Sequence, residues 1–335
     1  MGFIKKLFFN FGELTRVYAL PVTLASCILI WAFAKYNESF TYLNFGLLVL
    51  ALCCVHLGAN LFDDYVDTKK KLKVCGSLEN ISFDRFALKA NLILNRTFSF
   101  KEVRFVIFML FLIATCIGIH FAINVSIYVL IYALIGGVFA LFYPIAPKFC
   151  LGEIIIGLIY GPLMINGGYL ALTGEFNYNL FLCSVAVFFT AIVLLHTDNL
   201  MDWEHDIAEN KKTLCIISGS KLNAIKWLKI AIFCSYAIVV AAVLLGCFNP
   251  KTFYVFLTLP IAVKLPASLN DYINIRDIDF QPRWYYGPFE NWKKIKAARI
   301  DFFMYRMYLA RNYLFFFALF LAIGAITGNC VFSSL

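Results

Sequence analysis

Nine mostly apolar stretches of about 18 residues or more follow one another along this chain, and they constrain its fold more than any other feature. A helix of about 20 residues is long enough to cross a hydrocarbon core of about 30 Å, so each stretch is a candidate membrane span. The stretches lie at residues 17–35, 43–62, 103–123, 125–143, 153–172, 179–197, 224–247, 252–269 and 307–328. The sequence therefore predicts an all-α, polytopic membrane protein with nine transmembrane helices.

Composition supports a membrane protein. Only 15% of the 335 residues are charged and 62% are hydrophobic, whereas soluble domains carry about 25% charged residues. No Pro/Gly/Ser-rich linker divides the chain, so we expect residues 1–335 to form a single transmembrane domain.

The basic residues predict an orientation. With nine spans and the N-terminus inside, all but Lys35 and Lys251 of the 29 lysines and arginines fall on the inner side. Because positive residues are enriched in cytoplasmic loops, we expect the N-terminus and the long polar segments 67–102, 198–223 and 270–303 to be cytoplasmic, in a bacterial inner (cell) membrane. The net charge of +9 then indicates affinity for anionic lipid or phosphate, and nothing indicates nucleic acid as a partner.

An acidic cluster ends the second apolar stretch. Asn60, Asp63, Asp64 and Asp67 lie at offsets of 0, 3, 4 and 7 residues, so on a helix they share one face. Like charges at this spacing repel one another, and the cluster therefore calls for a cation.

A second acidic cluster ends the sixth stretch. Asp198, Asp202 and Asp206 follow one another at four-residue steps, and Asn199 is adjacent. The matched endings of the second and sixth stretches indicate a weak internal duplication, with two four-helix halves and a ninth helix. Repeats of this kind often place a binding site between the halves.

Two kinds of cation could neutralise these clusters. Lysines follow each of them, at Lys69, Lys70, Lys71 and Lys73 and at Lys211 and Lys212, and ordinary ion pairs would account for either cluster alone. Two matched clusters on one side of the membrane favour Mg²⁺, which is typically held by carboxylates together with substrate phosphates. A diphosphate at the membrane face with an apolar tail in the bilayer is a polyprenyl diphosphate.

Both clusters resemble signatures of the UbiA superfamily of intramembrane prenyltransferases. "DDYVD" is similar to the family's Asn-Asp-x-x-Asp, with Asp63 in the Asn place before Asp64 and Asp67. "NLMDWEHDIAENKKTL" is similar to the second signature, with matches at Asn199, Asp202, Asp206, Lys212, Thr213 and Leu214. Weaker matches are Arg16, Pro21, Tyr143, Lys148, Gly152, Glu153, Gly161, Pro162 and Gly174. The resemblance covers residues 12–250 and is strongest to the 1,4-dihydroxy-2-naphthoate polyprenyltransferases of menaquinone biosynthesis.

The resemblance implies a nine-helix bundle around a lateral cavity, with Mg²⁺, a polyprenyl diphosphate donor and an aromatic acceptor. By matched position the catalytic, Mg²⁺-diphosphate-binding residues are Asp64, Asp67, Asp202 and Asp206. Asp63 and Asp198 are two further implied metal ligands. The first motif continues into lysines where the family has a further Asp, and Asp198, which stands where an Asn is usual, supplies a carboxylate in its place. The implied substrate-binding residues are Asn60, Asn199, Tyr143, Lys148, Lys212 and Arg16. Arg16 meets an acceptor carboxylate in this interpretation, and helix capping or lipid contact is its alternative.

Several alternatives stay open from the sequence. A secondary transporter of an anionic or prenylated lipid is one, although transporters tend to place ionisable residues near the bilayer midplane. A non-catalytic lipid-binding relative and a family enzyme with another acceptor, such as 4-hydroxybenzoate, are others. The aromatic and basic residues 281–296 predict either an interfacial anchor, which we favour, or a lid.

The histidines and cysteines give no site by sequence spacing. His56 and His196 are expected to be buried and hydrogen-bonded. The 11 cysteines show neither a CxxC pair nor a metal-ligand spacing, so we expect them to pack as small apolar side chains.

Overall fold

The computed structural model describes residues 2–78, 90–274 and 280–327, and these residues form helices and no strand. Eight helical segments are long and apolar enough to cross a membrane, and the bent pair Phe3–Ala19 and Pro21–Ala34 makes a ninth if it counts as one span. Each predicted stretch overlaps one of these nine segments, which confirms the predicted all-α membrane architecture.

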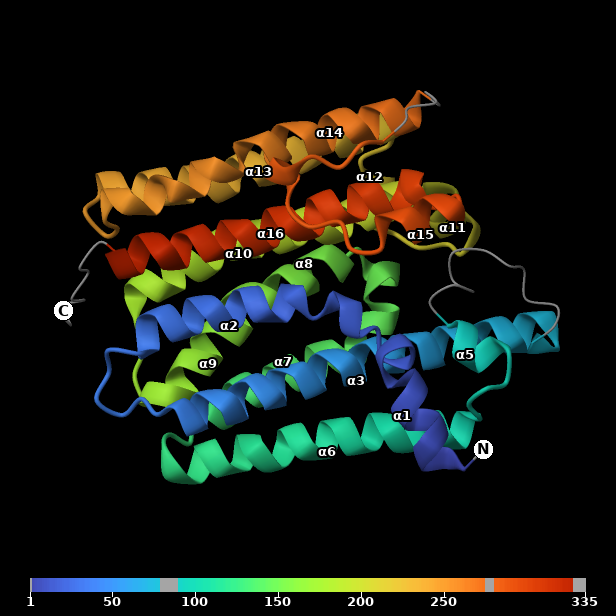
Figure 1. Ribbon diagram of the computed structural model, residues 1–335, viewed down its shortest axis with the longest axis horizontal. Coiled ribbons are helices and arrows are strands. Elements are labelled where there is room, and N and C mark those ends of the chain that lie inside the picture. The colour runs from blue at the N-terminus through green and yellow to red at the C-terminus, as the bar shows by residue number, and fades with distance from the viewer. Residues whose placement is uncertain (1, 79–89, 275–279, 328–335) are drawn as a thin grey trace.

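The spans lie side by side in a bundle (Figure 1). In chain order they are α2 (Pro21–Ala34), α3 (Tyr42–Cys75), α6 (Phe100–Asn124), α7 (Val129–Phe142) with η3 (Tyr143–Phe149), α8 (Gly152–Leu158) continued through η4 (Ile159–Leu163) into α9 (Met164–Thr173), α10 (Tyr178–Met201), α13 (Lys221–Leu244), η5 (Pro250–Thr258) with α14 (Leu259–Ile273), and α16 (Asp301–Thr327). The last span, α16, packs against α2 from the first four spans and against α10 and α14 from the next four. The contacts therefore agree with two four-helix groups joined by a ninth helix.

One end of the bundle carries the short polar elements. The helices α11 (Trp203–Ala208), α12 (Leu214–Ile217) and α15 (Trp292–Ala297) lie at the end where α3 and α10 finish (Figure 1). The amphipathic helix α1 (Phe3–Leu14), which exposes Phe8 and Phe9, lies toward the same end. This end is where the acidic clusters meet.

The helix α3 is longer than the apolar stretch that predicts it. It begins at the Thr41 cap, whose side chain accepts a hydrogen bond from the Asn44 backbone, and continues to a left-handed Gly76. Its 34 residues rise about 51 Å, well beyond a hydrocarbon core of about 30 Å. Within the predicted loop 67–102, Lys69, Lys70, Lys71 and Lys73 therefore lie on a helical extension. Residues 79–89 of that loop fall outside the described part of the chain.

The second acidic cluster is not on one continuous helix. The helix α10 ends at Met201, Asp202 adopts a non-helical conformation, and α11 starts at Trp203. The chain thus turns between Asp198 and Asp206, which alters the single stripe that four-residue spacing predicts.

The segment 281–296 packs on the polar half of α16. Asn312 donates hydrogen bonds to the carbonyls of Tyr286 and Pro288, and Arg311 bonds Glu290. Trp284 is 90% exposed and points away from this contact. None of the described residues 281–296 lines the cavity between the two acidic clusters. This favours the interpretation of the segment as an interfacial anchor over its interpretation as a lid.

Candidate active site

A cavity of about 390 Å³ opens between α3 and the α10–α11 turn at the polar end of the bundle. Its walls come from α3, η3, the end of α10, α11 and the residues after it, with single contributions from the α1–α2 break, α14 and α16. The lining residues are Arg16, Asp63, Asp64, Asp67, Lys71, Tyr143, Pro144, Pro147, Leu195, Asp198, Asn199, Met201, Asp202, Glu204, His205, Asp206, Glu209, Lys211, Thr213, Tyr272 and Phe302. The two acidic clusters therefore face one space.

Asp64 is buried at the inner wall and is held by Arg16. The Arg16 Nε donates to Asp64 Oδ2 at 3.0 Å, and a terminal guanidinium nitrogen donates to Oδ1. Arg16 has a left-handed backbone (φ 57°) at the break between α1 and α2, where the chain bends by 63°. This two-point contact is the strong form of an Arg–carboxylate pair. The Arg16 side chain therefore contacts Asp64 and does not cap the short helix η1 (Val17–Ala19) that follows it.

Lysines of α3 connect the first cluster to neighbouring segments. Lys70 Nζ donates to Asp67 Oδ1 at 3.0 Å and to the Pro144 carbonyl at 2.9 Å. Lys71 Nζ lies 3.4 Å from Glu209 Oε1, so α3 is tied to the segment after α11.

Asp206 is the most deeply buried acid of the second cluster, at 3% exposed. Its Oδ1 lies 3.2 Å from Lys211 Nζ, whereas its Oδ2 is buried and accepts no hydrogen bond from the described residues. Burial raises the pKa of Asp206 from 3.8 to about 6, although the Lys211 ammonium acts to lower it. The Oδ2 atom without a hydrogen bond and the raised pKa both indicate that the described residues only partly stabilise the negative charge of Asp206.

Charge counting decides how far lysines can neutralise this site. The described lining includes eight carboxylates against one arginine and two lysines. Lys70 and Lys221 lie outside the lining and pair with Asp67 and Glu204. Among the described residues the carboxylates of this cavity outnumber the lysines and arginines beside them, and a bound cation suits such a site.

The donors suit Mg²⁺. Carboxylate oxygens are the ligands that Mg²⁺ prefers. Asp206 Oδ2 is such an oxygen, and it accepts no hydrogen bond from the described residues. The carboxylates that face the cavity include all six predicted metal ligands, Asp63, Asp64, Asp67, Asp198, Asp202 and Asp206. The residues present thus fit a magnesium site.

Three predicted substrate-binding residues lie outside the cavity lining, namely Asn60, Lys148 and Lys212. Lys148 and Lys212 are exposed. The Lys212 backbone N–H donates to the Pro147 carbonyl at 2.7 Å, and it is Lys211 that faces the cavity. Asn199, Tyr143 and Arg16 do line it.

The cavity also contains residues that the motifs do not single out. Tyr272 and Phe302 come from α14 and α16, and the Tyr272 hydroxyl donates to the Met201 carbonyl at 3.1 Å. No sequence signal near the acidic motifs marks them, because only tertiary packing brings these helices to the site.

The two histidines behave as predicted. His56 is buried and bonds Thr23 and Tyr160, and His196 is buried with its Nε2 2.9 Å from the Ala224 carbonyl. Neither lines the cavity.

Comparisons with known proteins agree with this fold. A relative at 24% identity over 258 residues, 75% of this chain and 79% of its own length, is 1,4-dihydroxy-2-naphthoate octaprenyltransferase of Bacillus subtilis (strain 168). A 122-residue match at 30% identity, 36% of this chain and 39% of the relative, is to 2-carboxy-1,4-naphthoquinone phytyltransferase of Synechocystis sp. (strain ATCC 27184 / PCC 6803 / Kazusa). The fold is also that of a UbiA homolog from Archaeoglobus fulgidus bound to GPP and Mg²⁺, with a TM-score of 0.59 at 13% identity over 95% of this chain and 99% of that one.

The family model for the UbiA prenyltransferase family matches residues 19–273, which is most of the chain and includes both acidic clusters. An enzyme family, and not a transporter family, thus accounts for the spans and the cavity together. The chain is an integral membrane protein that belongs to the UbiA prenyltransferase family, and it is a transferase.

Proposed function

We propose that the chain transfers a polyprenyl group from a prenyl diphosphate to an aromatic acceptor of the 1,4-dihydroxy-2-naphthoate type, in quinone (menaquinone) biosynthesis. The observation that carries this proposal is the single cavity that both acidic clusters line. The names of the two relatives, a naphthoate octaprenyltransferase and a naphthoquinone phytyltransferase, support the acceptor class.

In this proposal Mg²⁺ is held by Asp63, Asp67, Asp198, Asp202 and Asp206, with Asp64 shared between the metal site and Arg16. When bound, Mg²⁺ neutralises the diphosphate and stabilises it as a leaving group. The A. fulgidus homolog bound to GPP and Mg²⁺ supports the metal.

The chain's own residues position the donor. Lys71 and Lys211 line the cavity beside both clusters, and in our proposal they take the diphosphate contacts that the family resemblance gives to Lys148 and Lys212. Arg16 keeps the Asp64 carboxylate in a fixed orientation through its two hydrogen bonds. Asn199 lies between Asp198 and Asp202 in the chain and is held by Glu153 at 2.7 Å, which fixes this part of the wall.

The cavity lining also contains apolar side chains. Leu195, Met201 and Phe302 line the cavity together with Tyr272. These side chains exclude water from the allylic carbon, and the aromatic faces stabilise positive charge that develops on it. In the transfer the allylic carbon–oxygen bond breaks, a carbon–carbon bond to the acceptor ring forms, diphosphate leaves, and the ring carbon of a naphthoate acceptor loses its carboxylate as CO₂.

The experiment is a prenyl-transfer assay with the purified protein in lipid nanodiscs. We expect labelled geranylgeranyl or a longer prenyl group to move to 1,4-dihydroxy-2-naphthoate when Mg²⁺ is present and not in excess EDTA. Asp202→Asn and Asp67→Asn should each lower the rate by at least about 100-fold, because each removes a ligand charge from the site.

Glu175→Gln is the matched control, since Glu175 bonds Asn37 in an exposed contact outside the cavity, and its rate should equal that of the wild type. Full activity of the Asp variants or full activity in EDTA would refute the mechanism. Transfer to 4-hydroxybenzoate or to a lipid acceptor instead of the naphthoate would refute the acceptor while leaving the family activity intact.

A further inference from the structure

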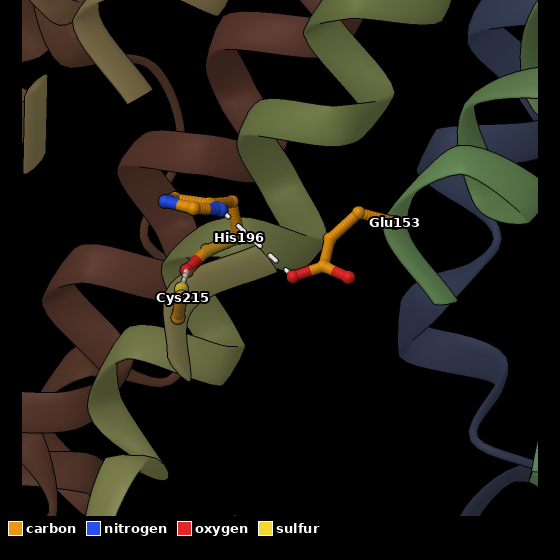
Figure 2. Close-up of side chains that lie close together, drawn as sticks. All are labelled: Glu153, His196 and Cys215. Carbon is orange, nitrogen blue, oxygen red and sulfur yellow. Dashed lines mark hydrogen bonds and ion pairs between the residues drawn. The ribbon is translucent and has the colours of Figure 1, made fainter. Parts of the chain in front are cut away.

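Behind the cavity wall lies a buried cluster of three different side chains, Glu153, His196 and Cys215 (Figure 2). They come from the start of α8, from α10 and from α12, segments that only the fold brings together. One carboxylate oxygen of Glu153, one ring nitrogen of His196 and the Cys215 sulfur lie within 4.8 Å of one another. Glu153 and Cys215 are 0% exposed and His196 is 2% exposed.

His196 presents a lone pair to this cluster. Its Nε2 lies 2.9 Å from the Ala224 carbonyl, and because a carbonyl only accepts, Nε2 carries the proton. The other ring nitrogen, Nδ1, lies 3.8 Å from Glu153 Oε1. A histidine whose second N–H is fixed by a backbone carbonyl is the usual arrangement of a metal-ligating imidazole.

Among the described residues, Glu153 is a buried acid without a lysine or arginine partner. Its Oε1 accepts hydrogen bonds from Asn199 Nδ2 at 2.7 Å and from the Leu214 backbone at 2.9 Å, while Oε2 is buried and accepts no hydrogen bond from the described residues. No lysine or arginine forms an ion pair with it among the described residues. A lone pair from His196 and a carboxylate oxygen that face each other repel unless a proton or a metal cation lies between them.

The combination of sulfur, imidazole nitrogen and carboxylate oxygen selects a class of metal. Thiolate and imidazole suit zinc and similar transition metals, whereas Mg²⁺ takes oxygen ligands. Tetrahedral zinc with bonds of about 2.0 to 2.3 Å holds its ligand atoms about 3.3 to 3.7 Å apart. The cluster needs to contract by about 1 Å to reach this spacing, and Cys215 lies on a helix of only four residues.

We propose that Glu153, His196 and Cys215 form a second metal site, distinct from the acidic cavity, that binds one zinc ion or a divalent transition metal of similar preference. With a thiolate, a carboxylate and a neutral imidazole as ligands, the bound site has no net charge, which suits its burial. Burial raises the pKa of the Cys215 thiol, and the neighbouring Glu153 carboxylate adds to this. Metal binding therefore displaces the thiol proton into solvent as the sulfur–metal bond forms.

In this proposal the metal supports the fold and takes no part in prenyl transfer. The three ligands join α8, α10 and α12, and Glu153 also bonds Asn199, which lines the acidic cavity. A metal bound by these three residues would hold the end of α10 against α8 and α12, on the side away from the acidic cavity. This proposal does not depend on the proposed prenyl transfer, and it is tested with metals alone.

The experiment measures metal binding by the full chain, purified without a histidine tag and dialysed against EDTA. We expect one Zn²⁺ per chain after reconstitution, counted by mass spectrometry of the metal. Co²⁺ in its place should give the intense near-ultraviolet absorption of a thiolate–Co²⁺ bond, which the oxygen ligands of the acidic cavity do not produce.

Two buried cysteines provide a matched pair of variants. Cys183 is 1% exposed on α10 and is not in the cluster, so Cys183→Ala should keep the Co²⁺ band and the rise in Tm that Zn²⁺ gives the wild type. Cys215→Ala should lose the band and weaken Zn²⁺ binding at least 100-fold.

If Cys215→Ala does not fold, the Co²⁺ spectrum of the wild type and of Cys183→Ala decides. A spectrum without the thiolate band overturns the proposal and leaves a hydrogen-bonded cluster that holds a proton. Zinc that stays far below one per chain, or zinc that Cys215→Ala binds as tightly as the wild type, also overturns it.

Discussion

At the scale of single residues, the pair Arg16–Asp64 shows how a charge is held at the edge of the membrane. Asp64 is 2% exposed, and Arg16 reaches it with two hydrogen bonds from a different segment of the chain. Removal of one partner of a buried pair leaves the other charge uncompensated, which costs about 3 to 5 kcal/mol.

We therefore predict that Arg16→Gln lowers the Tm of the purified protein by several degrees or more, and that Asp64→Asn in the same chain restores part of the loss. The measurement is thermal unfolding in detergent for the wild type, both single variants and the double variant. Additive losses in the double variant would show that the two side chains do not interact energetically.

Six of the eight acidic residues that line the cavity were predicted from their positions at the ends of two apolar stretches, although the chain turns within the second cluster and Glu204 and Glu209 were not predicted. The lysines that line the cavity were not singled out by the motifs. The chain turns at Asn210 (φ 53°), and the Lys212 backbone bonds Pro147, so that Lys211 faces the cavity while Lys212 is exposed. Glu153, His196 and Cys215 come from three separate segments, and no local spacing predicts that such residues meet.

At the scale of elements, the junction between α8 and α9 depends on a glycine. Pro162 lacks a backbone donor, and the chain forms a π-helical turn in which Gly161 has φ −92° and ψ −107°. A β-carbon at Gly161 would lie 2.6 Å from the Ser184 carbonyl oxygen and 2.9 Å from the Phe188 nitrogen, both on the backbone of α10.

We predict that Gly161→Ala lowers the Tm clearly, because η4 and α10 must separate to admit the methyl group, at a cost of about 1 to 3 kcal/mol. Gly136→Ala in α7 is the control, since a β-carbon there meets nothing within 4 Å and alanine favours the helix by up to about 1 kcal/mol. Equal Tm values for the two variants would contradict the close approach of η4 to α10.

The existence of the spans was predictable, whereas their ends and breaks were not. Hydropathy marks the part of a helix that lies in lipid, so it missed the polar extension of α3 to Cys75. It also gives no sign of the break at Asp202, where α10 stops and α11 begins. These two departures from the apolar pattern are the ones that shape the cavity, because they extend one acidic cluster into the polar end and turn the other.

At the scale of the whole molecule, the bundle has one charged end and one nearly uncharged end. The cavity, α11, α12 and α15 lie at the charged end (Figure 1). At the other end the predicted external segments and adjoining helix ends contain only Lys35 and Lys251 as basic residues. We propose that the charged end faces the cytoplasm, because positive residues near span ends resist translocation.

This orientation predicts opposite accessibility for two tight turns in the full-length chain. Gly219 precedes α13 at the charged end and Gly246 follows it at the other end, and both turns have a left-handed glycine with open space around it. An epitope inserted at Gly246 should be labelled by antibody on intact spheroplasts, whereas one at Gly219 should be labelled only after the membrane is permeabilised. Retained prenyl transfer by both insertions shows that the fold survives, and the reverse labelling pattern would place the cavity on the outer face. In that case the donor would have to be supplied from outside the cell, so this one measurement decides from which side of the membrane prenyl diphosphate reaches the site.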